Sequence, residues 1–147
     1  MVKIVESDAL LPRHTSFGWL IAVLASQLES DLDSRLREIG LNIGSWPTLF
    51  ALWEEDGLTQ TELTNRCHTA HYTTTRTLDA LEKQGLVERR PHPTSRRSHL
   101  VCLTARGKKL ETSATAMAQA CNEDVLSALS AKERTQLNTL ILKLLAE

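Results

Sequence analysis

The apolar positions in the first third of the chain recur at helical spacing. Between Phe17 and Ile39 they fall three or four residues apart, which is the repeat of an amphipathic helix. Gly40 is typical of a C-terminal helix stop. A second helix is predicted to begin near Ser45, with Pro47 in its first turn, and to end before Asp56–Gly57.

The next stretch predicts two short helices. Thr59 and Glu62 have the spacing of a capping box, in which the hydroxyl and the carboxylate bond each other's backbone amides. This box opens a helix that runs to about Cys67. A further helix is predicted over residues 70–84, with Gly85 as its C-terminal glycine.

Two strands are predicted after these helices, over residues 86–90 and 99–103, because both segments are rich in residues that favour strands. The segment between them contains Pro91 and Pro93, which exclude a helix and a central strand. The pair is therefore interpreted as a β-ribbon with a basic tip.

The final third predicts two more helices. Thr104 is the expected cap of one helix over residues 105–129, and Ser130 with Glu133 forms a second capping box. The last helix carries leucines and an isoleucine at core spacing between Leu137 and Leu145. The expected fold is mainly α with a small β-ribbon.

The charge of the chain is divided unevenly along it. Residues 60–109 hold ten Lys or Arg and four acids, a net charge of +6, although the whole chain of 147 residues has a net charge of −1. A basic middle between acidic flanks favours a surface that binds a polyanion. The longest apolar stretch, residues 17–25, is too short to span a bilayer, so we expect a cytoplasmic protein without a membrane partner.

The sequence offers little support for an enzyme. It contains no nucleophile elbow, no glycine-rich phosphate loop and no His-x-x-x-His with a third ligand. Cys67, Cys102 and Cys121 form no CxxC pair, so no metal site and no cofactor is predicted. These thiols are expected to be reduced and mostly buried, with a redox-sensing role as the alternative.

Two short helices followed by a basic β-ribbon are the order of a winged helix-turn-helix, whose second helix enters the DNA major groove. On that helix Thr74, Leu78 and Leu81 share a face that should be buried. The other face is polar, and a DNA major groove admits one such helix. The candidate DNA contacts on and before this helix are Thr69, His71, Tyr72, Thr73, Thr75 and Arg76.

The ribbon supplies a second group of candidate DNA contacts. Arginine suits a narrow minor groove, where the negative potential is enhanced, and Arg96 and Arg97 lie at the ribbon tip. Arg89 and Arg90 on the first strand can reach phosphates or serve as structural ion-pair partners. The candidates on the ribbon are Arg89, Arg90, Ser95, Arg96 and Arg97.

Across these motifs the chain resembles the MarR family of bacterial regulators. The resemblance rests on the ordered series from Leu58 to Gly107, including residues 58–63, 73–90 and 95–97. It implies a homodimer whose first and last helices interlock, with two recognition helices on a pseudo-palindromic operator and the wings in flanking minor grooves. Many members of the family are repressors released by small phenolic or lipophilic ligands, and some are released by thiol oxidation.

The resemblance also implies a division of the chain. Residues 1–40 would form an N-terminal arm and dimerisation helix, residues 41–107 the DNA-binding lobe, and residues 108–147 the C-terminal dimerisation helices. A small aromatic or lipophilic effector would bind between the dimer helices and the lobe. The candidate pocket residues, by their chemistry, are His14, Trp19 and Trp46.

The wing departs from the family pattern. Where the family often has Asp-Pro-x-Asp-Arg-Arg, this chain has His92-Pro-Thr-Ser95-Arg-Arg. An acid at these positions can orient a wing arginine through a charge-assisted hydrogen bond. Without it, Arg96 and Arg97 are predicted to lack a local anchor, and His92 is expected to be a solvated loop residue.

Other functions remain open at this stage. An architectural protein would bind DNA without sequence preference and with a steep salt dependence. An interaction module would dock a protein in place of DNA. The sequence favours a sequence-specific regulator over both because the basic ribbon directly follows a polar helix face.

Overall fold

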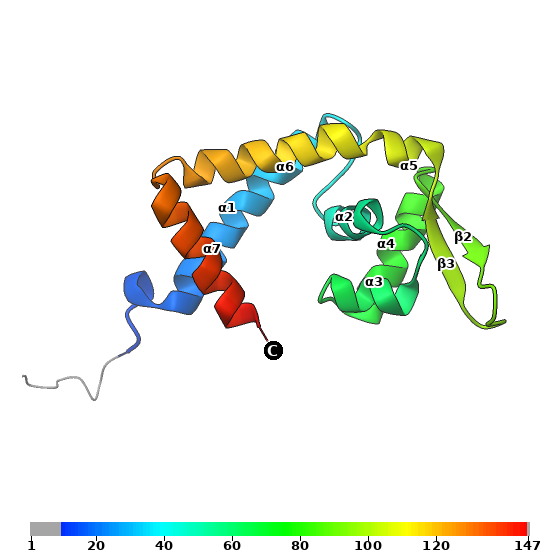
Figure 1. The fold of residues 1–147 in the computed structure, drawn as a ribbon, viewed down its shortest axis with the longest axis horizontal. Coiled ribbons are helices and arrows are strands. Elements are labelled where there is room, and N and C mark those ends of the chain that lie inside the picture. The colour runs from blue at the N-terminus through cyan, green and yellow to red at the C-terminus, as the bar shows by residue number, and fades with distance from the viewer. Residues whose placement is uncertain (1–9, 147) are drawn as a thin grey trace, which may run out of the picture.

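The structure is a computed structural model in which residues 10–146 are described. The chain is mostly helical with one small sheet (Figure 1). Its elements in order are a 3-10 turn (Arg13–Thr15), α1 (Phe17–Arg37), α2 (Trp46–Glu54), β1 (Leu58–Thr59), α3 (Gln60–Arg66), α4 (His71–Lys83), β2 (Val87–Pro91), β3 (His99–Leu103), α5 (Ala105–Lys109), α6 (Glu111–Leu126) and α7 (Ala131–Leu145).

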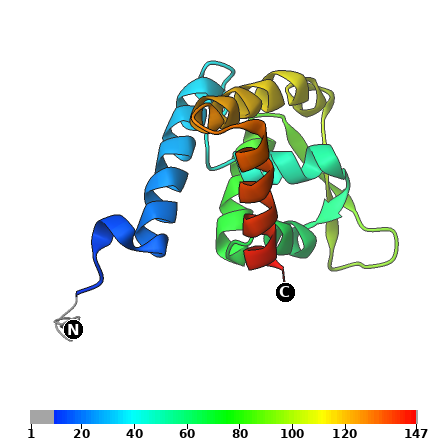
Figure 2. The ribbon, with the colours of Figure 1, turned by 60° about the vertical axis from the view of Figure 1, so that its left-hand side comes forward.

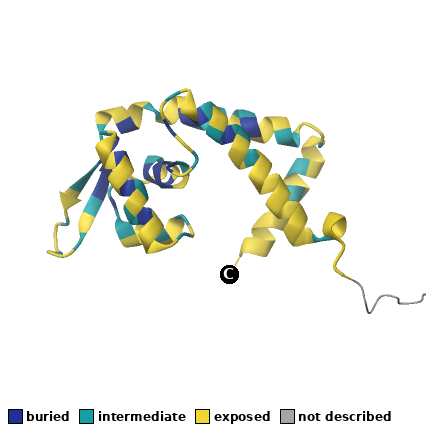
Figure 3. Ribbon diagram, turned by 180° about the vertical axis from the view of Figure 1, so that it is seen from behind, coloured by how far each residue is buried: buried dark blue, intermediate teal, exposed yellow. Residues whose placement is uncertain are grey.

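The elements form two parts. Helices α2 to α5 and the sheet make a lobe, and α1, α6 and α7 make an arm in which α1 lies against α6 (Figures 1 and 2). Most of the fully buried leucines lie in the lobe, whereas the far end of the arm is exposed (Figure 3). Among the described residues, no helix combines the length and the apolarity that crossing a membrane requires.

The local signals read from the sequence are confirmed. Thr59 with Glu62, and Ser130 with Glu133, form complete capping boxes at the starts of α3 and α7. Gly85 has a φ of +71° after the end of α4, a conformation that glycine adopts without steric cost. Each of these features depends on only a few neighbouring residues.

The sheet differs from the predicted ribbon because it has a third strand. Its order is β1-β3-β2, and all neighbours are antiparallel. Asp56 Oδ1 accepts the backbone N–H of Leu103 at 2.8 Å, and the Gly57 N–H donates to Val101 O at 3.1 Å. These bonds hold the two-residue strand β1 beside β3, and such a short strand has no hydrophobic repeat by which the sequence could reveal it.

The single helix expected over residues 105–129 is also wrong, because it is divided at Leu110 into α5 and α6. In a continuous helix the Gly107 carbonyl would accept the amide of Glu111. In this structure that carbonyl accepts the indole N–H of Trp53 at 2.9 Å. The bond ties α5 to α2, and the direction of the chain changes where the lobe meets the arm (Figure 1).

Candidate nucleic-acid interface

Helix α4 is fixed in the lobe by the face that the sequence assigns to the core. Thr74, Leu78 and Leu81 are buried, which confirms the predicted orientation of the helix. The Thr64 hydroxyl donates to the buried Thr74 hydroxyl at 2.8 Å, so that this polar group has a partner. The contact also locks α3 against α4.

The opposite face of α4 is exposed near its first turns. Tyr72, Thr73 and Arg76 are all exposed, and the Tyr72 side chain is 69% exposed. The Arg76 guanidinium lies 5.7 Å from the centre of the Tyr72 ring. An exposed aromatic ring and a guanidinium one turn apart can together reach base edges in a major groove.

Two other candidates on α4 are already engaged within the protein. Gln60, the first residue of α3, donates its amide N–H to the Thr75 hydroxyl at 2.5 Å, and the same Nε2 lies 3.1 Å from His71 Nε2. The Thr75 hydroxyl also donates to the His71 carbonyl at 3.1 Å. Gln60 therefore orients both side chains, a role that sequence reasoning did not identify.

Thr69 lies in the turn between α3 and α4 and is half-buried. Its backbone N–H donates to Thr64 O at 3.3 Å. The preceding residue, His68, has a φ of +48°, which a non-glycine residue adopts only in tight turns of this kind. This turn connects the end of α3 to the start of α4.

The two strand arginines have carboxylate partners. Arg89 forms ion pairs with Asp79, at 2.9 Å, and with Glu82, both on α4. Arg90 donates from Nε to Glu88 at 2.7 Å and remains more than half exposed. Arg89 therefore joins the wing to the recognition helix, which is the structural role that the sequence left open for one of this pair.

The wing turn is organised by His92. Its Nδ1 accepts the backbone N–H groups of Thr94 at 3.2 Å and Ser95 at 3.1 Å. The expectation of a merely solvated histidine is wrong, because the imidazole here acts as a turn cap. Ser95 is half-buried beneath this turn.

Arg96 and Arg97 are exposed in the turn between β2 and β3. This turn projects from the lobe (Figure 2). Neither arginine forms an ion pair with any residue in the range 10–146. This agrees with the prediction that the missing acids leave both guanidinium groups without a local anchor. Two uncompensated positive charges are therefore held at the end of a ribbon.

A polar hollow of about 260 Å³ lies where α3, α4 and the wing meet. It brings together three predicted residues, His71, Arg89 and Arg97, although they are distant in sequence. Sequence reasoning missed the rest of its lining, which is Thr59, Gln60, Thr61, Ser98, His99 and Val101. The capping box at Thr59, which the sequence reveals, fixes the first turn of α3. That turn lines the hollow only because the wing packs close to it, which the sequence does not reveal.

The three cysteines are placed as expected. Cys102 and Cys121 are buried and Cys67 is half-buried, and none forms a disulfide. Burial raises the pKa of each thiol, and that of Cys121 to about 11. Thiols at neutral pH are poor nucleophiles when their pKa is raised, which argues against the redox-sensing alternative.

The three candidate effector residues are not brought together within one chain. His14 and Trp19 are exposed at the start of the arm, whereas Trp46 begins α2 in the lobe. Trp46 stacks on Phe50 with ring centres 4.8 Å apart and borders a shallow hollow with Glu54 and Cys67. Neither His14 nor Trp19 lines that hollow.

Comparison with known proteins gives concordant results. Residues 41–99 match the model of the MarR family. The HTH-type transcriptional regulator BilQ of Clostridium symbiosum (strain WAL-14163) is 26% identical over 129 residues, which cover 88% of this chain and 90% of BilQ.

Two solved structures share the fold. A MarR transcriptional regulator from Methanosarcina mazei Go1 has a TM-score of 0.83 at 27% identity, covering 87% of this chain and 92% of that one. The S. aureus MepR–DNA complex has a TM-score of 0.82 at 23% identity, covering 89% and 97%. The matched domain, the curated relative and the shared winged-helix fold show that residues 41–99 match the MarR family domain and that the chain is similar to MarR-type transcriptional regulators.

Proposed function

We propose that the chain is a homodimeric repressor that binds a pseudo-palindromic duplex operator and is released by a small effector. The observation that carries DNA binding is that an exposed polar face on α4 lies beside a wing with two arginines, neither of which pairs with a carboxylate in the described range 10–146. The first turns of α4 would read base edges in the major groove, and Arg96 and Arg97 would enter the minor groove. The S. aureus MepR structure is a complex with DNA, which supports the same use of this fold.

Within this arrangement the candidate contacts divide into two kinds. Tyr72, Thr73 and Arg76 would read bases because they are exposed and Arg76 forms no ion pair with any residue that the structure describes. The polar hollow would hold a backbone phosphate, contacted by His71 and Arg97, because it lies between the helix and the wing. Thr69, Thr75, Arg89, Arg90 and Ser95 would position these groups or contact flanking phosphates.

The homodimer is supported by an apolar surface on the arm that the chain itself leaves uncovered. On α1 the exposed apolar residues are Phe17, Trp19, Leu20, Ile21, Val23 and Leu24, and on α7 they are Leu140, Ile141, Leu142, Leu144 and Leu145. An exposed patch of this extent marks an interaction surface. A second copy would cover it and would interlock the regions 1–40 and 108–147, leaving 41–107 as the DNA-binding lobe.

Selection of bound sequences from a random duplex pool tests the proposal. We expect an inverted repeat whose half-sites lie about one helical turn apart, ~34–36 Å, because a two-fold dimer presents two recognition helices. Sedimentation of the free protein should give a dimer. Enrichment without a consensus would instead indicate the architectural alternative, and a monomer that binds a single half-site would contradict the dimer.

Two substitutions that each remove one positive charge test whether the wing contacts DNA. Arg97→Ala should weaken operator binding and make the salt dependence shallower by about one counterion per wing, because one phosphate-region contact is lost. Lys132→Ala removes the same charge at the start of α7, at the opposite end of the molecule from the wing (Figure 1), and should change neither quantity. Equal effects of the two substitutions would show that only net charge matters.

The proposal of an effector site rests on the stacked aromatic pair Trp46 and Phe50. Phe50 is 51% exposed although it stacks on an indole, and an open aromatic surface suits an aromatic or lipophilic ligand. His14 and Trp19 could complete such a site only from the partner copy. Quenching of Trp46 fluorescence by candidate effectors, with release of operator DNA, would support this, and Trp46→Phe serves as the spectroscopic control. A regulator of this kind would act in the cytoplasm.

A further inference from the structure

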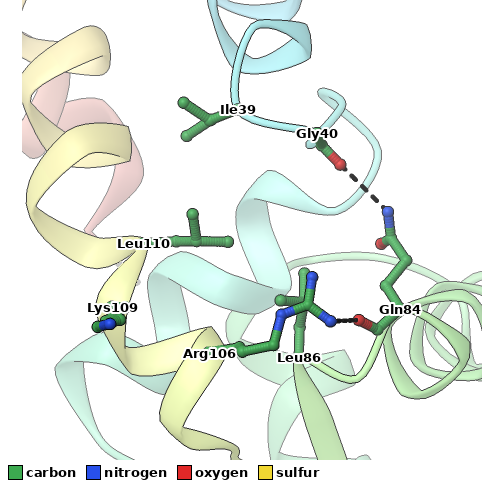
Figure 4. A pocket seen from close by; sticks show the side chains of 7 residues that line it. All are labelled: Ile39, Gly40, Gln84, Leu86, Arg106, Lys109 and Leu110. Carbon is green, nitrogen blue, oxygen red and sulfur yellow. Dashed lines mark hydrogen bonds between the residues drawn. The ribbon is translucent and has the colours of Figure 1, made fainter.

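Another cavity lies at the junction of three segments (Figure 4). It has a volume of about 420 Å³ and lies between the loop after α1, the end of α4 and the α5–α6 corner. This volume is in the range of small-molecule pockets, ~300–1,000 Å³. Its lining residues are Ile39, Gly40, Gln84, Leu86, Arg106, Lys109 and Leu110.

The cavity is distinct from the DNA-reading surface. The exposed candidates lie in the first turns of α4, whereas Gln84 follows its last residue. A helix of 13 residues is roughly 20 Å long at about 1.5 Å per residue. The positive charges beside Gln84 are therefore remote from the end of α4 that would meet DNA.

The positive charge of the cavity is not balanced by a carboxylate of any described residue. Arg106 and Lys109 both line it, and neither has a carboxylate partner in the described part of the chain. Arg106 donates one N–H to the Gln84 carbonyl at 2.8 Å, but a guanidinium has five N–H donors. The remaining donors and the Lys109 ammonium are free to bind an anion.

The rest of the lining is apolar. Leu86 is buried, and Ile39 and Leu110 are half-buried. Gln84 reaches across one side and donates to the Gly40 carbonyl at 3.1 Å, so its amide is already engaged (Figure 4). Gly85, without a side chain, leaves room for the Arg106 guanidinium, whose Nη1 would lie 3.3 Å from a Cβ at that position.

We propose that this cavity binds an organic anion with an apolar body, such as a medium-chain carboxylate. The carboxylate would be held by Arg106 and Lys109, and the chain would cover Ile39, Leu86 and Leu110. The ligand would touch the loop after α1, the residue that follows α4 and the corner between α5 and α6. The binding site rests on this geometry and not on the proposed operator binding, so either can fail without the other.

Titration of the full-length protein with octanoate, followed by calorimetry, tests the proposal. We expect saturable binding that is at least tenfold weaker for the double variant Arg106→Gln/Lys109→Gln. The matched control is Lys108→Gln, because Lys108 is exposed on the same helix but does not line the cavity. It should bind octanoate within about twofold of the parent protein.

Two comparison ligands separate the parts of the proposal. Octan-1-ol lacks the charge and acetate lacks the apolar body, so each should bind at least tenfold more weakly than octanoate. Because Arg106 also caps α4, a thermal melt checks that each variant is folded. If Arg106→Gln is unfolded, Lys109→Gln alone should still weaken binding at least threefold. Absence of saturable octanoate binding, or equal binding by the parent and the variants, would overturn the site.

Discussion

Gly107 offers a sharp test of how the lobe is joined to the arm. A Cβ built on this residue would overlap the carbonyl oxygen of Leu86, and it would lie 3.1 Å from the Leu86 carbonyl carbon and 3.2 Å from Leu103 Cδ2. Carbon atoms in proteins normally approach no closer than ~3.5 Å. Since two of these neighbours are backbone atoms, Gly107→Ala must push α5 away from the sheet.

The expected loss of stability in Gly107→Ala is the sum of unfavourable and favourable contributions to the free energy of unfolding. Overpacking costs about 1–3 kcal/mol, and movement of α5 would weaken the Trp53–Gly107 hydrogen bond, worth about 1 kcal/mol. Alanine in a helix stabilises the folded state by about 0.5–1 kcal/mol relative to glycine. The net expectation is about 2 kcal/mol of destabilisation. For a chain of this length that lowers Tm by roughly 6 °C, at about 3 °C per kcal/mol.

The measurement is thermal unfolding followed by circular dichroism at fixed protomer concentration, because the stability of a dimer depends on concentration. Gly18→Ala is the control, since Gly18 lies in α1 and a Cβ there meets nothing within 4 Å. Its Tm should stay the same or rise by up to about 3 °C. If Gly107→Ala melts at or above the parent protein, the argument from close approach is refuted.

Three further predictions concern the wing and the thiols. Arg89→Gln should lower Tm and weaken binding to all DNA sequences, because Asp79 and Glu82 lose their link to the wing. The slope of log affinity against log salt concentration should stay the same. A slope shallower by about one would show that Arg89 contacts a phosphate instead. His92→Ala should weaken operator binding about fivefold, because the wing turn loses roughly 1 kcal/mol of hydrogen bonding. His92→Asn keeps a hydrogen-bond acceptor and should bind the operator nearly normally. Equal losses of operator affinity in the two variants would contradict the capping role. Cys121, with a pKa raised to about 11, should be about one part in a thousand thiolate at pH 8 and react with a maleimide only on unfolding. Rapid labelling of Cys121 in the native protein would restore the redox alternative.

The features that the sequence predicted well depend on neighbouring residues. The capping boxes at Thr59 and Ser130, and the helix stop at Gly85, are formed by hydrogen bonds and backbone preferences within a few positions. The buried face of α4 also follows from spacing alone, since Thr74, Leu78 and Leu81 repeat at helical intervals. For the same reason, the polar face with Tyr72 and Arg76 could be located without a structure.

The features that it missed depend on contacts between distant segments. Strand β1 exists because Asp56 captures the amide of Leu103, and α5 ends because Trp53 binds the carbonyl of Gly107. The partners of each bond are about 50 positions apart, so no local pattern reveals them. The role of Arg89 was left open because the sequence does not place β2 beside the acids of α4.

The sequence by itself determined the order of the longer helices and of the two wing strands, the polar face of α4 and the basic tip of the wing. These properties follow from periodicity, capping and charge within short stretches. The tertiary structure alone decided that Gln60 orients His71 and Thr75, that His92 caps the wing turn, and that Arg106 and Lys109 share a cavity with the loop after α1. The physical reason is that each of these placements depends on how elements pack against one another, and that packing is set by burial summed over residues far apart in the chain.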